Sequence, residues 1–156
     1  MPVSVRRIGS AEAVRSGSII IQAYAEPPWE ERWSIENATA RLEELTGTPG
    51  YVGFAAVDGE ALIGFVFALP HTTAHGSGLH ISEIAILPQY QRMGIGSALL
   101  LQVEQEALKN NNRQIWLVSR RVGGVADYYS ANGYHQSETL RVYIKRLHGE
   151  IAPQHS

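Results

Sequence analysis

The clearest pattern in the chain is a set of apolar residues at helical spacing between Ile95 and Lys109. Leu99, Val103 and Ala107 follow Ile95 at intervals of four residues, which places them on one face of a helix. Lys109 stands at the carboxyl end, where its positive charge suits the helix dipole. The pattern predicts an amphipathic helix over residues 95–109.

Strand-like and helix-like segments alternate in the first third of the chain. Residues 3–8 predict a strand and residues 11–25 a helix, and the proline pair at 27–28 interrupts regular structure. Ser34 is the predicted N-cap of a further helix that ends at Gly47. The apolar residues at helical spacing within it are Ile35, Ala38, Leu42 and Leu45.

The middle of the chain predicts an antiparallel hairpin. Residues 51–57 and 60–69 are rich in Val, Ile and Phe, and Asp58-Gly59 between them is a two-residue turn signal. Residues 79–87 predict another strand, which Pro88 ends because proline cannot donate a hydrogen bond to a neighbouring strand.

The last third predicts a strand at 114–119, a short helix at 125–132 closed by Gly133, and strands at 134–137 and 140–147. The strand, helix and strand between residues 79 and 119 predict two parallel strands joined by a right-handed crossover. With the hairpin, this order predicts an α+β fold with a mixed central sheet and helices on both faces.

Composition narrows the class of protein. A chain of 156 residues with 44% hydrophobic and 18% charged residues suits one globular domain, which we expect at residues 1–148 with a flexible tail at 149–156. The net charge of −2 argues against an electrostatic nucleic-acid or membrane binder. The absence of cysteine excludes disulfides, thiolate metal sites and a cysteine nucleophile. With no signal peptide recognised in the sequence, we expect a cytoplasmic protein.

The segment between the predicted 79–87 strand and the predicted 95–109 helix contains the first candidate functional residues. Gly94 and Gly96 let backbone amides converge at the positive end of the helix dipole, an arrangement that binds phosphate. A P-loop requires a lysine and a hydroxyl residue after its last glycine, but Ser97-Ala98 follows here. A dinucleotide fingerprint requires a third glycine where Leu99 stands.

The turn does match the pattern Gln/Arg-x-x-Gly-x-Gly/Ala, as Gln91-Arg92-Met93-Gly94-Ile95-Gly96. With this context the chain resembles the GNAT superfamily of N-acetyltransferases, whose order of elements covers residues 3–147. The segment ADYYSANGY at 126–134 is similar to the family signature Ala-x-Phe-Tyr-x-x-x-Gly-Phe. The resemblance implies a mostly antiparallel mixed sheet whose fourth and fifth strands are parallel and splay apart.

The resemblance also implies acetyl-CoA as cosubstrate. In the family, the pantetheine arm inserts beside the fourth strand and the pyrophosphate binds the glycine turn. The implied cofactor-binding residues are Ile84 and Ile86 through their main chain, then Gln91, Arg92, Met93, Gly94, Ile95, Gly96 and Ser97, and Tyr129. Arg92, Arg120 and Arg121 are also candidates for phosphate contacts, although a solvated surface position is the favoured interpretation of each one alone.

Without cysteine, the simplest reaction is direct attack of an amine on the thioester in a ternary complex, after the amine has lost a proton. Glu83 and His80 are both candidate bases, and Glu83 is slightly favoured. The alternatives are a structural hydrogen bond near the start of the strand for Glu83 and a partly exposed loop position for His80. The resemblance implies that Tyr129 protonates the departing thiolate. The sequence departs from the family at Val118, where some relatives have a glutamate, and at Gly123, where an asparagine is frequent.

The acceptor side is implied to be the loop between the first two helices of the family fold. Trp29, Glu30 and Trp33 suit a cationic amine through ion pairing and cation–π contacts, and equally suit helix capping and packing. His71 and His75 lie with His80 in or beside a flexible loop, and we expect no metal there.

Three functions remain open at this point. We expect a small-molecule N-acetyltransferase, with a protein or peptide N-acetyltransferase and a catalytically silent acyl-CoA-binding sensor as alternatives. The expected partner is a small-molecule amine rather than nucleic acid or a membrane, and a homodimer is compatible with the sequence.

Overall fold

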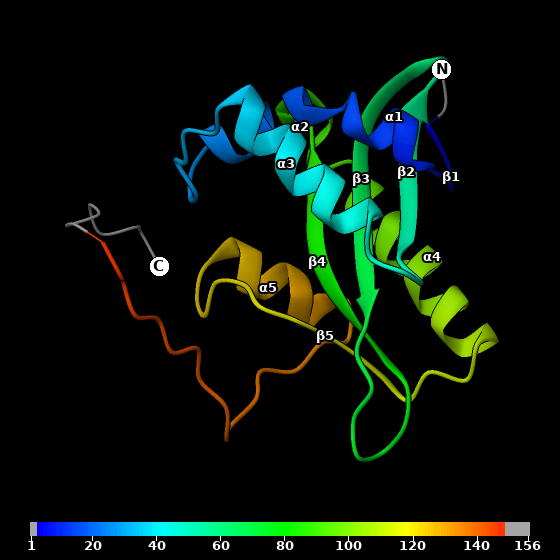
Figure 1. The fold of residues 1–156 in the computed structure, drawn as a ribbon, viewed down its shortest axis with the longest axis vertical. Helices are drawn as coiled ribbons and strands as arrows, with labels where there is room; N and C mark the ends of the chain where they lie inside the picture. The colour runs from blue at the N-terminus through cyan, green and yellow to red at the C-terminus, as the bar shows by residue number, and fades with distance from the viewer. Residues whose placement is uncertain (1–2, 149–156) are drawn as a thin grey trace. The chain divides into compact units, whose positions relative to one another are not determined.

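The computed structural model describes residues 3–148 (Figure 1). The chain divides into two compact units, Met1–Leu117 and Val118–Ser156. The tail expected at 149–156 lies outside the described residues.

The first unit is built on a five-stranded sheet in the order β1-β2-β3-β4-β5. Its strands are β1 (Val3–Arg7), β2 (Val52–Asp58), β3 (Ala61–Pro70), β4 (Gly78–Ile86) and β5 (Gln114–Leu117). Neighbouring strands from β1 to β4 are antiparallel, whereas β4 and β5 are parallel. The predicted mixed sheet and its parallel fourth and fifth strands are confirmed.

The hairpin turn lies one residue later than predicted, on Gly59 and Glu60. Asp58 remains in β2, opposite Ala61, and its carboxylate accepts a hydrogen bond of 2.6 Å from the Tyr90 hydroxyl. Tyr90 belongs to the short 3-10 helix η1 (Pro88–Tyr90), so this bond joins the hairpin to the segment before the glycine turn.

The single helix predicted over 11–25 is wrong, because the segment forms α1 (Ser10–Val14) and α2 (Gly17–Ala25). The helix breaks at Ser16, whose N–H bonds the Ala13 carbonyl and whose hydroxyl bonds the Glu12 carbonyl. A serine that bonds nearby backbone groups competes with the regular helical bonds, which accounts for the interruption.

Helix α3 (Ile35–Thr46) begins and ends where the sequence predicts. The Ser34 hydroxyl accepts a hydrogen bond of 3.0 Å from the Asn37 N–H, and Gly47 is the C-cap. Ala38, Leu42 and Leu45 are buried as predicted, whereas Ile35 is exposed.

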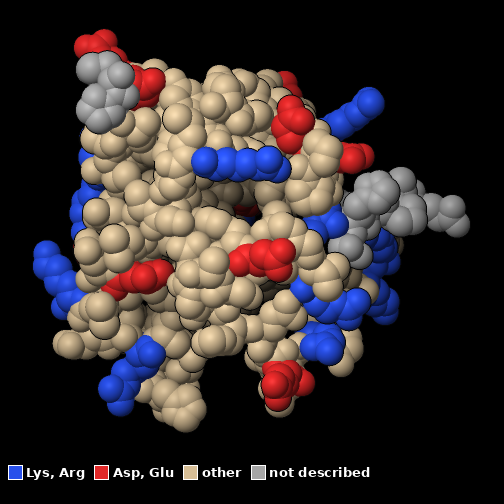
Figure 2. All heavy atoms as spheres, turned by 180° about the vertical axis from the view of Figure 1, so that it is seen from behind, with Lys and Arg blue, Asp and Glu red and all other residues tan. Residues whose placement is uncertain are grey.

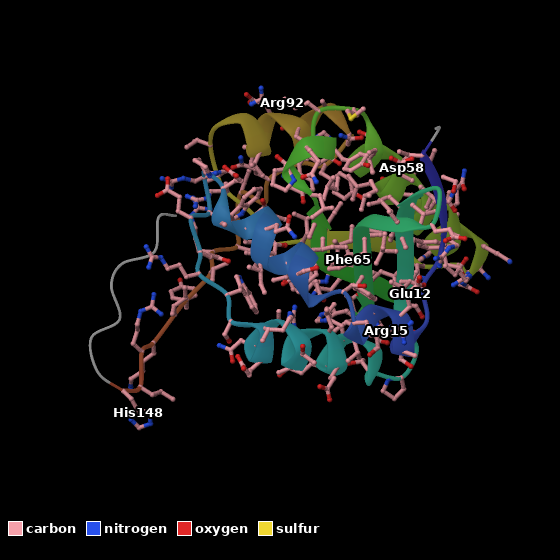
Figure 3. All side chains as sticks on the ribbon, turned by 90° about the horizontal axis from the view of Figure 1, so that it is seen from above. Glu12, Arg15, Asp58, Phe65, Arg92 and His148 are labelled. Carbon is pink, nitrogen blue, oxygen red and sulfur yellow. The ribbon has the colours of Figure 1, made fainter. Side chains whose placement is uncertain are left out.

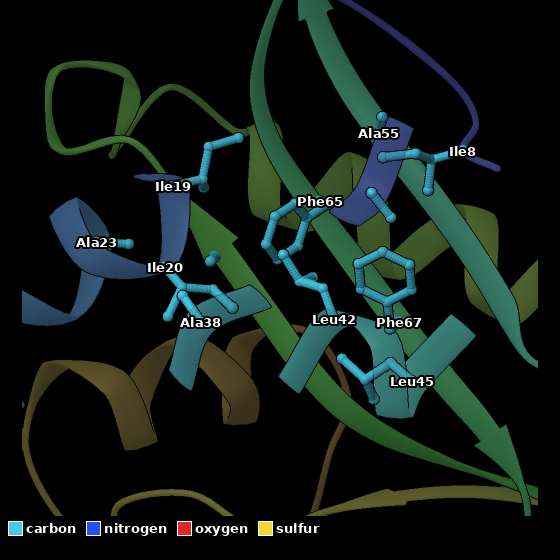
Figure 4. Packing of buried hydrophobic residues seen from close by; sticks show 12 residues of the cluster. Ile8, Ile19, Ile20, Ala23, Ala38, Leu42, Leu45, Ala55, Phe65 and Phe67 are labelled. Atoms are coloured by element: carbon cyan, nitrogen blue, oxygen red, sulfur yellow. The ribbon is translucent and has the colours of Figure 1, made fainter. Parts of the chain in front are cut away.

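Helices α1 to α3 pack on one face of the sheet, where Phe65 and Phe67 of β3 meet Ile20, Leu42 and Leu45 (Figure 4). Helix α4 (Ile95–Lys109) packs on the opposite face, against β2, β3 and β4 (Figure 1). Its boundaries match the predicted helix. Burial on both faces fixes the position of β4, the strand that carries Glu83 and His80.

The second unit contains α5 (Gly124–Ala131), which agrees with the predicted short helix. The residues after it, up to position 148, form no helix or strand, so the strands predicted at 134–137 and 140–147 are wrong. A strand requires a neighbour for its backbone hydrogen bonds, and the described part of this unit contains none. Apolar side chains of the second segment are therefore exposed, among them Leu140, Tyr143 and Ile144. The strand predicted at 114–119 is likewise shorter, since β5 ends at Leu117.

Candidate active site

Glu83 and His80 lie on the same face of β4 because the strand contains a bulge. Two residues three positions apart normally point to opposite faces of a strand. Here Phe67 pairs with Glu83 and the next residue, Ala68, pairs with Ile81, which leaves Ser82 as the extra residue of the bulge. Both candidate bases therefore face the side of the sheet that α2 and α3 cover.

Glu83 is held at both carboxylate oxygens. The Tyr24 hydroxyl of α2 donates a hydrogen bond of 2.8 Å to Oε2, and Arg41 Nε of α3 lies 3.3 Å from Oε1. Arg41 also donates to the Ser82 carbonyl at 3.1 Å. Three elements thus converge on one carboxylate, whose side chain is only 13% exposed.

Burial raises the pKa of Glu83 above the ordinary value of a glutamate, and the hydrogen bond from Tyr24 and the charge of Arg41 oppose that rise. A carboxylate in such surroundings binds a proton more readily than one in water. This property suits a group that must accept a proton from an amine.

The His80 imidazole stacks on the Trp116 indole, with ring centroids 4.0 Å apart. Its Nδ1 lies 3.1 Å from the Ser82 hydroxyl, and His71 contacts the same indole edge-on at 5.2 Å. Burial, with smaller contributions from the charges of His71 and Arg41, lowers the pKa of His80 and favours its neutral form. One ring nitrogen is therefore engaged and the ring orientation is fixed.

The end of α2 and the loop before α3 form a cluster of three aromatic rings and one carboxylate, comprising Tyr24, Trp29, Glu31 and Trp33. The Tyr24 ring contacts Trp29 at 5.5 Å and Trp33 at 6.4 Å between centroids. Trp33 Nε1 donates a hydrogen bond of 2.9 Å to Glu31 Oε1. Since Tyr24 also bonds Glu83, this aromatic–carboxylate cluster adjoins the candidate base.

The structure brings Trp29 and Trp33 into this cluster but not Glu30, which is exposed and adopts a φ of 48°. The carboxylate fixed among the rings is Glu31, whose N–H also bonds the Tyr24 carbonyl at 2.7 Å. Charge and position along the sequence do not distinguish two adjacent glutamates, so the sequence does not indicate which of them lies among the aromatic rings.

The outer edge of β4 lacks a strand partner beyond Ile81 among the described residues, since the pairing with β5 ends at Leu117 while β4 continues to Ile86. The Leu87 N–H bonds the Ile63 carbonyl of β3. Because backbone groups alternate in direction along a strand, those of Ile84 and Ile86 face this open edge. An extended chain with amide groups can pair there, as pantetheine is expected to do.

Two side chains reach the same edge. The Tyr24 hydroxyl lies 2.9 Å from the Ile84 carbonyl, and Gln91 Nε2 donates a hydrogen bond of 3.0 Å to the Ile86 carbonyl. Each carbonyl keeps a second lone pair, and the N–H groups of both residues have no partner among the described residues. Gln91 thus ties the start of the glycine turn to the end of β4.

The glycine turn directs backbone amides outward at the start of α4. Gly94 is the N-cap with a φ of 80°, a conformation that glycine adopts without strain. The first bond of the helix joins the Ala98 N–H to the Gly94 carbonyl. Among the described residues, the N–H groups from Arg92 to Ser97 have no hydrogen-bond partner, so they remain available to an anion at the positive end of the dipole.

The side chains of this turn fall into two groups. Ile95 is buried and anchors α4, whereas Met93 is 64% exposed. The Arg92 side chain is also exposed and projects outward from the ribbon (Figure 3). Figure 2 shows acidic as well as basic side chains on one face of the molecule. The feature of the turn that could hold an anion is its set of backbone amides.

Tyr129 lies in α5 of the second unit, and several residues of the ADYYSANGY segment form the C-terminal end of this helix. The Tyr134 N–H bonds the Tyr129 carbonyl and the Gly133 N–H bonds the Ser130 carbonyl, around a Gly133 φ of 88°. The rings of Tyr129 and Tyr134 also contact each other at 5.9 Å. These contacts are those of a Schellman motif, so the segment has a structural role that leaves the Tyr129 hydroxyl to be assigned separately.

Sequence reasoning missed two residues of the site. Arg41 has the sequence context of an ordinary helical arginine, and only the position of α3 beside α2 and β3 lets its side chain reach Glu83. Tyr24 of α2 bonds Glu83 and Ile84 across about sixty positions of sequence, and no local pattern indicates such contacts.

The described residues contain no group of three or more His, Asp or Glu side chains that could hold a metal ion. In the same part of the chain, no helix has the length and apolarity needed to cross a membrane.

Several solved structures have a similar fold. The structure resembles that of a possible acetyltransferase from Clostridium difficile 630, with a TM-score of 0.79, 12% identity, and coverage of 95% of this chain and 100% of that one. It also resembles AAC(6')-Iy in complex with the bisubstrate analogue CoA-S-monomethyl-acetylneamine, with a TM-score of 0.72, 18% identity, and coverage of 94% and 100%.

A third similar structure is an aminoglycoside acetyltransferase from an uncultured soil metagenomic sample, with a TM-score of 0.70 and 16% identity, over 94% of this chain and 100% of that one. At these identities the likeness shows a shared fold. The model of the acetyltransferase (GNAT) family matches residues 19–134, which is more than half of the chain. The protein therefore belongs to the GNAT acetyltransferase family.

Proposed function

We propose that the protein transfers the acetyl group of acetyl-CoA to the primary amine of a small molecule. The observation that carries the proposal is the arrangement around β4, where the open edge at Ile84 and Ile86 adjoins a buried carboxylate held by two partners. The edge and the glycine turn suit an acyl-CoA, and Glu83 suits an incoming ammonium group.

In the proposed reaction, Glu83 takes a proton from the bound ammonium, directly or through water. The amine nitrogen then attacks the thioester carbonyl carbon, and the C–S bond breaks as the new C–N bond forms. The thiolate leaves with the electron pair of the C–S bond, and Tyr129 is proposed to protonate it. The acylated nitrogen releases its extra proton, which restores the Tyr129 hydroxyl through water, and Glu83 returns the ammonium proton to solvent. The ground for Tyr129 is its match to the family signature.

His80 is the second candidate base. Its pKa is lowered while that of Glu83 is raised, so the ordinary pKa values of glutamate and histidine do not tell which of the two groups titrates first here. The position of the acid limb in a pH–rate profile therefore cannot identify the base. We favour Glu83 because it has a donor at each oxygen and adjoins the aromatic–carboxylate cluster.

The acceptor is proposed to bind at the aromatic–carboxylate cluster. The indole faces can bind a cation through cation–π contacts, and the Glu31 carboxylate can bind it through an ion pair. The solved relatives include aminoglycoside acetyltransferases, so aminoglycosides are suitable first acceptors to test.

The test is a CoA-release assay with acetyl-CoA and four acceptor classes: aminoglycosides, polyamines, amino acids and peptides. We expect release with a small amine and loss of that release in Glu83→Gln. Turnover with peptides alone would support a peptide acetyltransferase instead. Acetyl-CoA binding without turnover on any class would support a silent acyl-CoA sensor.

A further inference from the structure

The Tyr24 hydroxyl lies between two hydrogen-bond acceptors. It has one proton, yet two acceptors lie within hydrogen-bond distance, Glu83 Oε2 at 2.8 Å and the Ile84 carbonyl at 2.9 Å. A phenol can donate one such bond and can also accept one. The hydroxyl is therefore placed to bond Glu83 in either of two ways.

When Glu83 is a carboxylate, Tyr24 donates to Oε2. When Glu83 is protonated, its own O–H donates to the Tyr24 oxygen, and the Tyr24 proton turns to the Ile84 carbonyl. Both states keep the buried carboxyl group hydrogen-bonded without movement of a heavy atom. A buried polar group that loses its partner is costly, so this arrangement lowers the free-energy cost of moving the proton on and off Glu83.

Arg41 acts on the other oxygen. Its Nε lies 3.3 Å from Oε1 and it also bonds the Ser82 carbonyl, so the guanidinium is fixed on two groups of β4. Its positive charge favours the carboxylate, against the burial that disfavours it. Each carboxylate oxygen accepts more than one hydrogen bond, so Glu83 can still receive an amine proton.

The charges around Glu83 come from several elements. Glu31 of the loop before α3 is a like charge and favours protonation of Glu83. Glu44 of α3 lies 3.7 Å from Arg41 Nη1 and competes for the guanidinium, although Glu44 is mostly exposed. His80 shares the same strand face and senses the charge of Arg41. Arg41 is thus the cation, and Tyr24 the neutral donor, in direct contact with the carboxylate.

We propose that Tyr24 and Arg41 are positioning residues of the proposed transfer, Tyr24 by bonding Glu83 in both protonation states and Arg41 by keeping Glu83 ionised. This inference rests on the proposed function. It goes beyond it by assigning to these two side chains a role in the protonation of Glu83, which is separate from the part that Tyr24 has in the acceptor cluster.

The first test is the pH profile of kcat/KM in Arg41→Met, Arg41→Lys and Tyr24→Phe. Arg41→Met removes the cation, so less Glu83 is ionised at a given pH and the acid limb moves to higher pH. Arg41→Lys restores the charge and should return the limb toward that of the wild type. Losing a hydrogen bond to a charged group should lower kcat/KM near neutral pH by about 10- to 100-fold.

Tyr24→Phe should move the same limb upward and should also lower kcat on the plateau, because protonated Glu83 loses its acceptor. Arg6→Met and Tyr51→Phe are the matched controls. They remove a guanidinium bound to Glu12 and a phenol 3.4 Å from the Ile8 carbonyl. Both controls should leave the limb in place. An unmoved limb in Arg41→Met and Tyr24→Phe would overturn the proposal.

A second measurement separates this inference from the proposed function. The Glu83 carboxyl carbon, labelled with carbon-13, can be titrated by NMR in wild type and variants without any substrate. We expect its midpoint to rise in Arg41→Met and Tyr24→Phe and to stay near the wild-type value in Arg41→Lys. Midpoints that do not move would refute the roles of Tyr24 and Arg41, even in a protein that transfers acetyl groups. A folded protein that shows the shifts but no turnover would refute the proposed function alone.

Discussion

Replacing Gly94 by aspartate tests whether the glycine turn binds the pyrophosphate of acetyl-CoA. Gly94 is exposed and has a φ of 80°, and a Cβ added there would meet no atom of residues 3–148 within 4 Å. A side chain therefore fits, at the cost of the left-handed backbone, roughly 1–2 kcal/mol for an ordinary residue and less for Asn or Asp. Gly94→Asn is the matched control, because it has nearly the same shape and strain without the charge.

The magnitude follows from the position of residue 94 at the start of α4. One carboxylate roughly 6 Å from a bound phosphate, at an effective dielectric constant of about 20, repels it by about 2.8 kcal/mol. Such a repulsion weakens acetyl-CoA binding about 100-fold. The asparagine variant lacks this repulsion and should keep most of the affinity.

Thermal unfolding with and without acetyl-CoA is the assay. Ligand at about 100 times its Kd stabilises a protein by about 2.7 kcal/mol, or roughly 5–11 °C in Tm at this chain length. The same concentration should raise the Tm of Gly94→Asp by only about 1 °C. A wild-type shift in Gly94→Asp, or equal loss in Gly94→Asn, would refute the assignment of the turn.

The remaining predictions concern the base, the acid and a helix cap. Glu83→Gln should lower kcat/KM by about 10²- to 10⁴-fold and abolish the acid limb of the pH–rate profile, while the acetyl-CoA thermal shift stays intact. His80→Gln should keep that limb. The reverse pattern would make His80 the base. Tyr129→Phe should lower kcat much more than it weakens acetyl-CoA binding, and unchanged turnover would remove its role as acid. Ser34→Ala removes the hydroxyl that accepts from Asn37, so it should cost about 1 kcal/mol and lower Tm by about 2–4 °C, measured by calorimetry.

Local signals predicted the elements that local interactions determine. Helix α4 combines a continuous apolar face with a glycine N-cap, and α3 has a serine cap and a glycine end, so their boundaries were correct. The break at Ser16 was missed, because a serine inside a helical pattern has no signal that distinguishes a solvent-facing hydroxyl from one bonded to the backbone.

The geometry of the candidate site depends on contacts between residues that are far apart in the sequence. Glu83 was found as a candidate base, but the partners that set its properties come from α2 and α3, more than forty positions earlier. Glu83 and His80 lie on the same face of β4 because of the bulge at Ser82. Strict alternation of side chains along the strand would place them on opposite faces. The apolar segment 140–147 has the pattern of a strand, yet a strand forms only where a partner is available.

Transfer from acetyl-CoA labelled in its acetyl group, followed by mass spectrometry of the protein and of the products, tests the central claim most directly. The account predicts that the label appears on the nitrogen of the amine that supports CoA release, with none on the protein during turnover and little in free acetate. Label bound covalently to the protein as an intermediate, or recovered only as acetate, would contradict direct transfer to an amine.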